Sequence, residues 1–277
     1  MQAALQQRLD ALLRLDTQGY LARDPLRFPR RFSDPADQEI VGLLAAMLAY
    51  GRVELFAPVI EKILVLMAER GGPTPFVDHF GPLEEEALQP ILYRWNRHPD
   101  FSMLFRLMQR VRQDFGSIGA AFEPGPPKEL LGGGIQRLRA RVPLPMEQWS
   151  VGFRTWLPSP DDGSACKRWW LYLRWMVRQE APDLGLWTHL HPSMLLTPVD
   201  THVSRIGRLV GLTHRKDAGW RTAEEITASF AKLCPSDPVR YDFALAHLGI
   251  SDGCAGHFVG EICSLCPLQA VCREGAG

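Results

Sequence analysis

Apolar residues recur at helical spacing along almost the whole chain. Residues 40–51 form a compact apolar run, and residues 56–72 repeat apolar side chains at helical spacing until Gly71 and Gly72. Ser33 or Asp34, ahead of Pro35, is the expected N-cap of the first run. Further helices are predicted over residues 83–96, 101–115, 128–141, 164–179, 200–211, 222–233 and 238–249. No segment alternates with the period of two that marks a strand, so the predicted fold class is all-α.

Proline and glycine interrupt this pattern in three places. Loops or turns are expected at residues 123–134 and 157–164, the second reading LPSPDDGS and leading directly into a helix. Residues 181–200 form a long irregular connection, with Pro198 as its last proline and a helix after it. Connections of that length are usually functional or inserted, which draws attention to the two helices on either side.

Composition limits the classes of protein that fit. A chain of 277 residues with 46% hydrophobic residues can bury one good core or two modest ones. No apolar run approaches the roughly 18–20 residues that span a bilayer, and the start lacks a basic-apolar signal, so a cytoplasmic protein without a membrane partner is expected. Lys+Arg and Asp+Glu both total 31, so net charge supplies no general attraction to a polyanion.

Four cysteines lie close together near the end of the sequence, with the spacing C-x8-C-x2-C-x5-C. They are Cys254, Cys263, Cys266 and Cys272. Thiolates at this density suit an iron–sulfur cluster or a structural zinc ion, for which His257 is an alternative ligand. Disulfides are the third interpretation, and they fit poorly with a cytoplasmic chain.

Lys167 opens the helix SACKRWWLYLRWMVRQ. A lysine at a helix N-terminus meets the positive end of the helix dipole, and partial burial against Trp169 or Trp170 acts in the same direction. Both effects favour a neutral amine, which is a nucleophile able to form a Schiff base. The alternative is an ordinary surface lysine whose stem lies along apolar neighbours.

Asp200 precedes the amphipathic run THVSRIGRLVGL. Its position fits an N-cap, and capping alone would explain it. A cap and a catalytic carboxylate are compatible, because helix N-termini favour the ionised form.

These segments together resemble the helix–hairpin–helix, endonuclease III-like superfamily of DNA glycosylases. CSLCPLQAVC is similar to the loop that holds a [4Fe–4S] cluster there, although eight residues rather than the usual six separate the first two cysteines. VDTHVSRIGRLVGL resembles the segment with the catalytic aspartate, which places Asp200 at that position and Lys167 at that of the Schiff-base lysine. The chain also resembles an uncharacterised bacterial group of the DUF2400 type, in the segments CKRWWLYLRWMVR, PDLGLW and DPVRYDFALAHLGI. The separation of 33 residues between lysine and aspartate resembles the archaeal 8-oxoguanine glycosylase branch.

The resemblance implies a two-lobed helical fold with a C-terminal four-cysteine cluster loop. Residues 31–190 would form a helical bundle domain with the lysine helix, and residues 1–30 plus 191–277 a second domain with the aspartate helix. The implied activity is a monomeric DNA repair glycosylase with AP lyase activity, acting on double-stranded DNA with a damaged base, for which 8-oxoguanine is favoured. The implied cofactor is [4Fe–4S], with zinc as the lesser alternative.

The DNA contacts implied by the resemblance depart from the family pattern. Gly163 and Ser164 belong to the expected phosphate-binding hairpin, but Asp161 and Asp162 stand where an anion should dock. Relatives often carry a glutamine where this chain has Tyr50, Gly51 and Arg52. Further phosphate contacts are expected from Arg52, Arg205 and Arg208. The alternative for Arg52 is a surface arginine after a helix-ending glycine, and for Arg205 and Arg208 it is a solvated helix face.

Three other functions remain open from the sequence. In a monofunctional glycosylase, water attacks the sugar and Lys167 is incidental. In a non-catalytic nucleic-acid-binding protein, or a metal-stabilised module that binds no nucleic acid, the helices and cysteines have only structural roles. His202, two residues after Asp200, is either a proton shuttle or a structural hydrogen-bonding residue.

Overall fold

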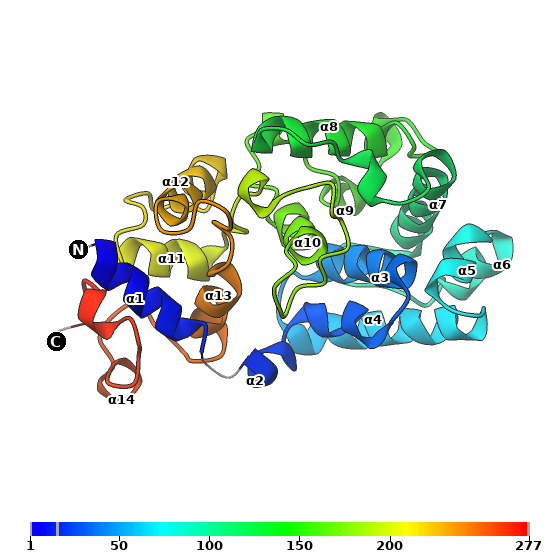
Figure 1. Cartoon of the computed structure of the whole chain (residues 1–277). Coiled ribbons are helices and arrows are strands. Elements are labelled where there is room, and N and C mark those ends of the chain that lie inside the picture. The colour runs from blue at the N-terminus through cyan, green and yellow to red at the C-terminus, as the bar shows by residue number, and fades with distance from the viewer. Residues whose placement is uncertain (1, 15–16, 276–277) are drawn as a thin grey trace. The chain divides into compact units, whose positions relative to one another are not determined.

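The computed structural model describes residues 2–14 and 17–275, and these residues form helices, turns and loops. Among them no strand occurs, and the only β-type pairing is an isolated bridge between Tyr93 and Asn96. The prediction of an all-α fold is therefore confirmed (Figure 1).

Contacts between Cα atoms divide the chain into two compact units. Unit 1 comprises Met1–Ala22, Gly163–Arg174 and His191–Gly277, and unit 2 comprises Arg23–Asp162 and Trp175–Leu190. This division differs from the predicted one at residues 23–30 and 163–174. The second difference has a clear cause: the side chains of Lys167 and Arg174 form ion pairs with aspartates of the C-terminal segment.

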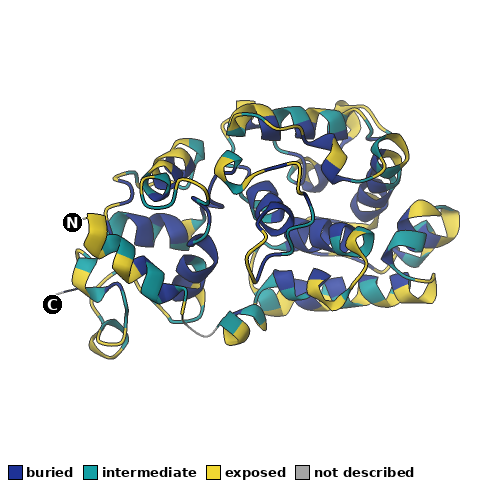
Figure 2. Ribbon diagram, in the orientation of Figure 1, coloured by how far each residue is buried: buried dark blue, intermediate teal, exposed yellow. Residues whose placement is uncertain are grey.

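Unit 2 is built around one almost fully buried helix, α3, which spans Pro35–Leu48. Asp34 caps it by accepting hydrogen bonds from the N–H groups of Ala36 and Asp37, and residues 39–48 are all buried (Figure 2). The other helices of this unit are α4 (Val53–Glu69), α5 (Pro73–Asp78), α6 (Pro82–Ala87), α7 (His98–Phe115), α8 (Pro127–Arg139) and α9 (Val151–Arg154). The long apolar run of the sequence thus becomes the central helix because apolar residues cover all of its faces.

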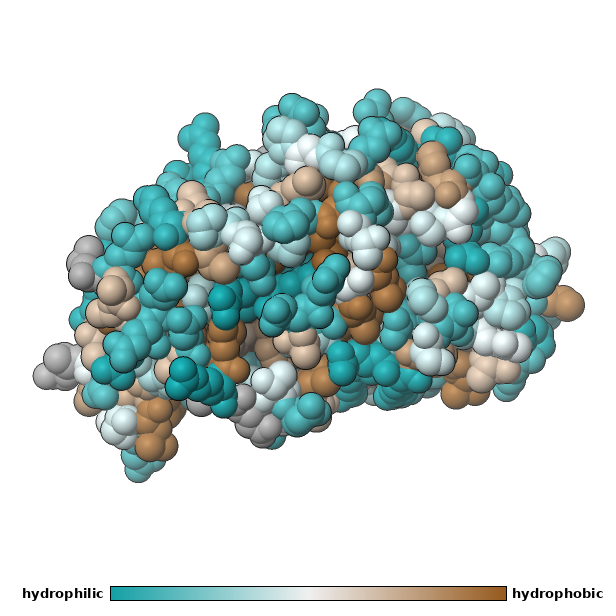
Figure 3. Space-filling view, viewed as in Figure 1, coloured by the Kyte–Doolittle hydropathy of each residue, from teal (hydrophilic) through white to brown (hydrophobic). Residues whose placement is uncertain are grey.

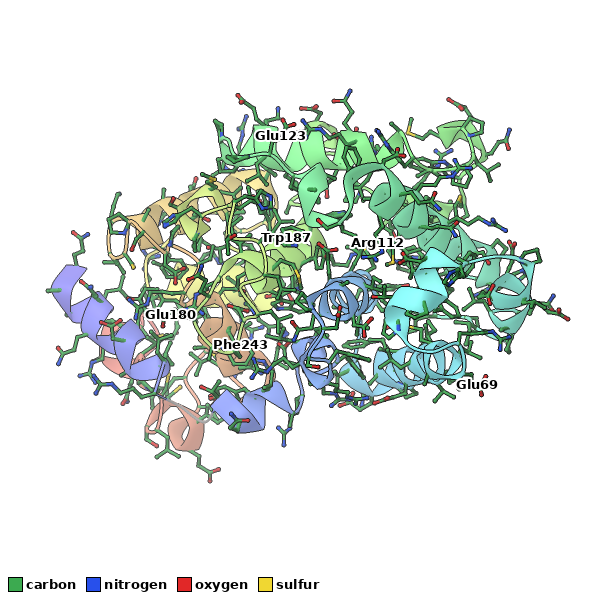
Figure 4. All side chains as sticks on the ribbon, turned by 45° about the vertical axis from the view of Figure 1, so that its right-hand side comes forward. Glu69, Arg112, Glu123, Glu180, Trp187 and Phe243 are labelled. Carbon is green, nitrogen blue, oxygen red and sulfur yellow. The ribbon has the colours of Figure 1, made fainter. Side chains whose placement is uncertain are left out.

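One carboxylate is buried on α3 and joins three segments of unit 2. Glu39 accepts hydrogen bonds from the N–H groups of Ile118 and Gly119 at 2.9 and 2.8 Å and from Trp187 Nε1 at 2.8 Å. Burial raises the pKa of Glu39, and these donors oppose the rise. Trp187 is labelled in Figure 4. The connection before Leu190 is therefore held to α3 by a specific polar contact.

Unit 1 contains the helices that matter for the candidate site. They are α1 (Gln2–Leu12), α2 (Thr17–Leu21), α11 (Thr201–Leu209), α12 (Trp220–Ala231), α13 (Asp242–Ile250) and α14 (Gly260–Cys263). Helix α10 (Lys167–Val177) contributes its residues up to Arg174. Helices α11 and α13 pack closely against each other (Figure 1).

Most predicted helices differ from the observed ones by a few residues at an end, and two of these differences have a clear physical reason. The helix predicted over residues 83–96 ends at Ala87, and a turn follows in which Arg94 has a φ of 52°. Pro90 explains the early end, because proline has no N–H to donate and disfavours helical geometry in the residue before it. The helix with the apolar run 40–51 has Asp34 as its cap, one of the two predicted, and begins at Pro35, but it ends at Leu48, before Gly51 with a φ of 83°.

No helix in the described ranges combines the length and the hydropathy needed to cross a membrane. Hydrophilic residues cover most of the face drawn in Figure 3.

Candidate active site

Lys167 is the first residue of α10, and two left-handed residues before it set the direction of its helix. Gly163 has a φ of 75° and Cys166 a φ of 50°. The hydroxyl of Ser164 accepts a hydrogen bond from the Cys166 N–H at 3.1 Å, and the Cys166 carbonyl accepts from the Trp169 N–H at 2.9 Å. A left-handed non-glycine residue costs energy, so its surroundings must hold the turn firmly. The backbone at Lys167 is therefore well defined.

Asp200 is the N-cap of α11, and each of its two carboxylate oxygens has a separate partner. Oδ1 accepts a hydrogen bond from the Val203 N–H at 2.8 Å, as the sequence predicted for a cap. Oδ2 lies 3.0 Å from Nζ of Lys167 and accepts a hydrogen bond from it. Capping fixes the carboxylate and leaves one oxygen for the lysine, so both roles proposed for Asp200 fit one conformation.

The pair is only partly accessible to solvent, with exposed fractions of 35% for the side chain of Lys167 and 15% for that of Asp200. Burial raises the pKa of Asp200, but the charge of Lys167 and the hydrogen bond from Val203 lower it more, so it lies below its usual range. Nζ of Lys167 and Oδ2 of Asp200 thus form an ion pair, and the neutral amine expected from the sequence requires transfer of a proton, with Asp200 as the nearest acceptor.

His202 and Arg205 extend this group of charges along α11. The charge of His202 contributes to lowering the pKa of Asp200. Nδ1 of His202 lies 3.2 Å from Nη2 of Arg205, which also donates a hydrogen bond to the carbonyl of Cys254. Helix α11 therefore carries Asp200 at one end and holds the first cysteine of the C-terminal run further along.

A second ion pair lies in unit 1, and sequence reasoning missed it. Arg174 of α10 donates from Nη1 to Oδ2 of Asp242, the first residue of α13, and both side chains are 2% exposed. Burial raises the pKa of Asp242, to about 6, against the attraction of Arg174. A charged residue inside an apolar run, as in WWLYLRWMV and YDFALAHLGI, was the available signal.

The residues predicted to contact DNA do not share one environment. Arg52 belongs to unit 2 and is exposed, with Nε 3.4 Å from Oε2 of Glu54. Arg205 binds the Cys254 carbonyl, and Arg208 donates to the hydroxyl of Ser204 and to backbone carbonyls of the following loop. Gly163 is exposed, and no heavy atom within 4 Å would meet a Cβ there. Of these residues, Arg52 and Gly163 present the most open surface.

The two acidic residues before Gly163 have positive partners. Oδ1 of Asp161 lies 2.8 Å from Nζ of Lys128, and Oδ2 of Asp162 lies 3.5 Å from Nη2 of Arg139, both partners belonging to α8. Both carboxylates remain largely exposed, so these pairs are weak. Helix α8 thus partly balances the negative charge that the sequence placed beside the hairpin.

The four C-terminal cysteines line one cavity of about 350 Å³, together with His257. None of them forms a disulfide. Burial raises the pKa of Cys266, and the charges of Cys254, Cys263 and Cys272 raise it further. Within residues 2–14 and 17–275, no three His, Cys, Asp or Glu side chains are grouped closely enough to hold a metal ion. The four predicted cysteine ligands therefore surround the same cavity, but their thiols are not grouped as closely as ligands of one metal ion would be.

Comparison with known protein families assigns the chain to a family. The model of a family described as "Protein of unknown function (DUF2400)" matches residues 24–251. That range includes both ion pairs and ends before Cys254. No curated protein and no solved structure matches the chain significantly.

Proposed function

Because the chain belongs to the family of proteins of unknown function named DUF2400, we propose its activity from the site itself: a DNA glycosylase with AP lyase activity, built on an endonuclease III-like fold. The observation that supports this most is the 3.0 Å contact between Nζ of Lys167 and Oδ2 of Asp200. An amine nucleophile beside an ionised acid is what displacement of a base from a sugar requires. The oxidised purine 8-oxoguanine is the favoured lesion.

The proposed reaction begins with proton transfer from Lys167 to Asp200 or to water. The neutral amine attacks C1′ of an extruded nucleotide, because that atom is out of reach inside the base stack. A bond forms between Nζ and C1′, and the bond from C1′ to the base breaks. The base leaves with the electron pair and takes up a proton. When Asp200 is the acceptor, it passes that proton to the departing base, and the carboxylate so restored stabilises the positive charge that develops on the sugar.

Strand cleavage follows from the same covalent species. The bond from C1′ to the ring oxygen breaks, a proton passes from Nζ to that oxygen, and a Schiff base forms between Nζ and C1′. Loss of a proton from C2′ then breaks the bond from C3′ to its oxygen, which leaves with the phosphate. Water finally hydrolyses the Schiff base and restores the amine of Lys167. No oxidant or reductant enters these steps, so nothing in them requires an electron carrier.

We also propose that Cys254, Cys263, Cys266 and Cys272 hold a [4Fe–4S] cluster, with zinc as the alternative. The cavity that all four line, and the preference of thiolates for these metals, support the proposal. Four thiols around one space repel one another as thiolates, and a metal centre supplies the missing positive charge. Its role would be to fix the loop that follows α13.

Borohydride trapping tests the activity directly. The protein is incubated with duplex DNA containing 8-oxoguanine or an abasic site, and reduction captures any Schiff base as a covalent adduct. The adduct is expected with the wild-type protein and absent with Lys167→Ala. An adduct that persists in Lys167→Ala would remove Lys167 as the nucleophile. Base release that needs alkali for strand scission would favour a monofunctional enzyme, and binding without turnover a non-catalytic protein.

A further inference from the structure

The ion pair between Arg174 and Asp242 is a poor choice for stability alone. Both side chains are 2% exposed, so folding removes two charges from water. The attraction within a buried pair often does no more than offset that loss, and apolar residues in its place are often equally stable. Oδ1 of Asp242 is buried as well and accepts no hydrogen bond from the described residues. A pair of this kind needs an explanation other than stability.

Its position relative to Lys167 and Asp200 supplies one. Lys167 and Arg174 are seven residues apart on α10, which is about two turns, so they lie on the same face about 10 Å apart along the axis. Their partners, Asp200 and Asp242, stand at the N-terminal ends of α11 and α13, which pack together. Two cations from one helix thus meet two carboxylates from a helix pair.

The two ion pairs also interact electrostatically. Burial is the main cause of the raised pKa of Asp242, while Arg174 lowers it, Asp200 raises it and Lys167 lowers it. His202 joins the network through Asp200. Among the described residues, the charged groups that shift the pKa of Asp200 or Asp242 include Lys167 and Arg174 from α10, His202 from α11, and Asp200 itself, which acts on Asp242.

We propose that Asp242, held by Arg174, is a positioning residue that controls how readily Lys167 gives up its proton to become a nucleophile. The inference rests on the proposed role of Lys167 in the activity above. As a carboxylate, Asp242 neutralises the charge of Arg174. Without it, Arg174 repels the ammonium of Lys167 across about two helix turns, and the proton leaves more easily.

The supporting measurement is the pH at which Lys167 becomes reactive, and it needs no DNA. Competitive labelling with acetic anhydride over a pH series, read by mass spectrometry, gives a midpoint for each of the five lysines of the chain. A unit charge about 10 Å away, at an effective dielectric constant of about 20, shifts such a midpoint by roughly one pH unit. In Asp242→Asn, the midpoint of Lys167 is expected to fall by that amount.

Two further variants separate charge from structure. Arg174→Gln combined with Asp242→Asn removes both charges, so the midpoint of Lys167 should return to within a few tenths of a pH unit of the wild-type value. Asp242→Glu keeps the charge and should also stay close to it. Asp100→Asn is the matched control, because Asp100 of unit 2 is equally buried, at 3% exposure, and contacts no residue of the network. It should lower stability without moving the midpoint of Lys167.

A reciprocal measurement covers the case in which Asp242→Asn does not fold. Coupling between two sites must be equal in both directions, so loss of the Lys167 charge must raise the titration midpoint of Asp242 by a similar amount. Carboxyl ¹³C NMR on aspartate-labelled wild-type protein and Lys167→Met measures this, since Lys167 is partly exposed and its loss is tolerable.

Each outcome decides the matter. A folded Asp242→Asn in which the midpoint of Lys167 does not move overturns the proposal. If that variant does not fold, an unchanged Asp242 midpoint in Lys167→Met overturns it. A protein that shows both shifts yet forms no borohydride adduct would refute the glycosylase activity and leave the control of Lys167 by Asp242 intact.

Discussion

Nζ of Lys167 lies 3.0 Å from Oδ2 of Asp200, although 33 residues separate the two in the chain. The contact joins the first residue of α10 to the N-cap of α11. Because Oδ1 of the same carboxylate accepts a hydrogen bond from Val203, the acid has little freedom to turn away from the amine.

The variant Asp200→Asn separates the helix-capping role of Asp200 from its proposed catalytic role. Asparagine caps helices as well as aspartate does, so α11 should still begin at Thr201, while the negative charge is lost. Turnover on lesion-containing DNA should fall by about 10²–10⁴-fold, with DNA binding retained. Asp34→Asn is the control, because Asp34 caps α3 in the same way without contacting Lys167. Equal losses in both variants would show that only helix capping matters.

The acid sensitivity of the protein should depend on Asp200. Its folded-state pKa lies below the unfolded value of about 3.9, so the folded state is stabilised above that pH and loses this stability as pH falls through the folded pKa. Urea denaturation of wild-type protein and Asp200→Asn should therefore differ most near pH 7 and converge at acid pH. A difference in unfolding free energy that stays constant down to pH 3 would contradict the assigned ionisation.

Asp242 should change the stability of the protein with pH in the direction opposite to that of Asp200. Its folded-state pKa is raised to about 6, so the stability that it contributes is fully present below the unfolded value of about 3.9 and is lost as pH rises through 6. The unfolding free energy of Arg174→Gln combined with Asp242→Asn should lack this decline between about pH 4 and pH 6. If wild-type protein and the double variant show the same slope over that range, Asp242 does not titrate there.

Gly163→Ala should destabilise the turn that precedes Lys167. The φ of 75° costs a residue with a Cβ roughly 1–2 kcal/mol, although no atom within 4 Å opposes the added methyl group. Gly132→Ala is the matched control: its Cβ also meets no atom, but it lies inside α8, where alanine should stabilise by about 0.5–1 kcal/mol. Chemical denaturation of both variants should give opposite signs. Stabilisation by Gly163→Ala would show that the turn is not left-handed.

Cys266→Ser should remove most of the bound metal. Elemental analysis for iron and zinc, together with the visible spectrum, identifies the metal centre. A brown protein that contains iron indicates the iron–sulfur cluster, and a colourless protein that contains zinc indicates a zinc site. Cys234→Ser is the control, because Cys234 does not line the cavity. Its metal content should equal that of the wild type. Purified protein with neither metal would contradict the assignment of all four cysteines.

Asp161→Asn combined with Asp162→Asn should strengthen binding to duplex DNA. The double variant removes two negative charges beside Gly163 that would repel a phosphate, so affinity at low salt should rise by roughly 3–10-fold and the rise should shrink with added salt. Asp78→Asn with Glu85→Gln breaks two comparable surface pairs elsewhere in unit 2 and should change affinity little. Equal effects from both double variants would indicate a general effect of net charge.

Local features of the sequence were sufficient for much of the helical structure. The N-cap roles of Asp34 and Asp200 and the irregular connection before Asp200 follow from short-range rules of capping and backbone geometry. The helix predicted through Pro90 was wrong, because the restriction that proline imposes on the backbone outweighs the helical spacing of the apolar residues there. Errors of this kind remain local, since each depends on neighbours in the chain.

By itself the sequence determined the helical class, the start of the aspartate helix and the presence of four cysteines in one short run. Only the tertiary structure decided that Lys167 forms an ion pair with Asp200. The same holds for the ion pair between Arg174, further along the same helix, and Asp242. Periodicity reveals which face of a helix is apolar, but it carries no information on which distant helix will cover that face. Phe243, labelled in Figure 4, lies next to Asp242 on α13 and under the guanidinium of Arg174. Arg174 and Asp242 meet because packing brings α10 and α13 together, and a buried charge is less costly beside an opposite one.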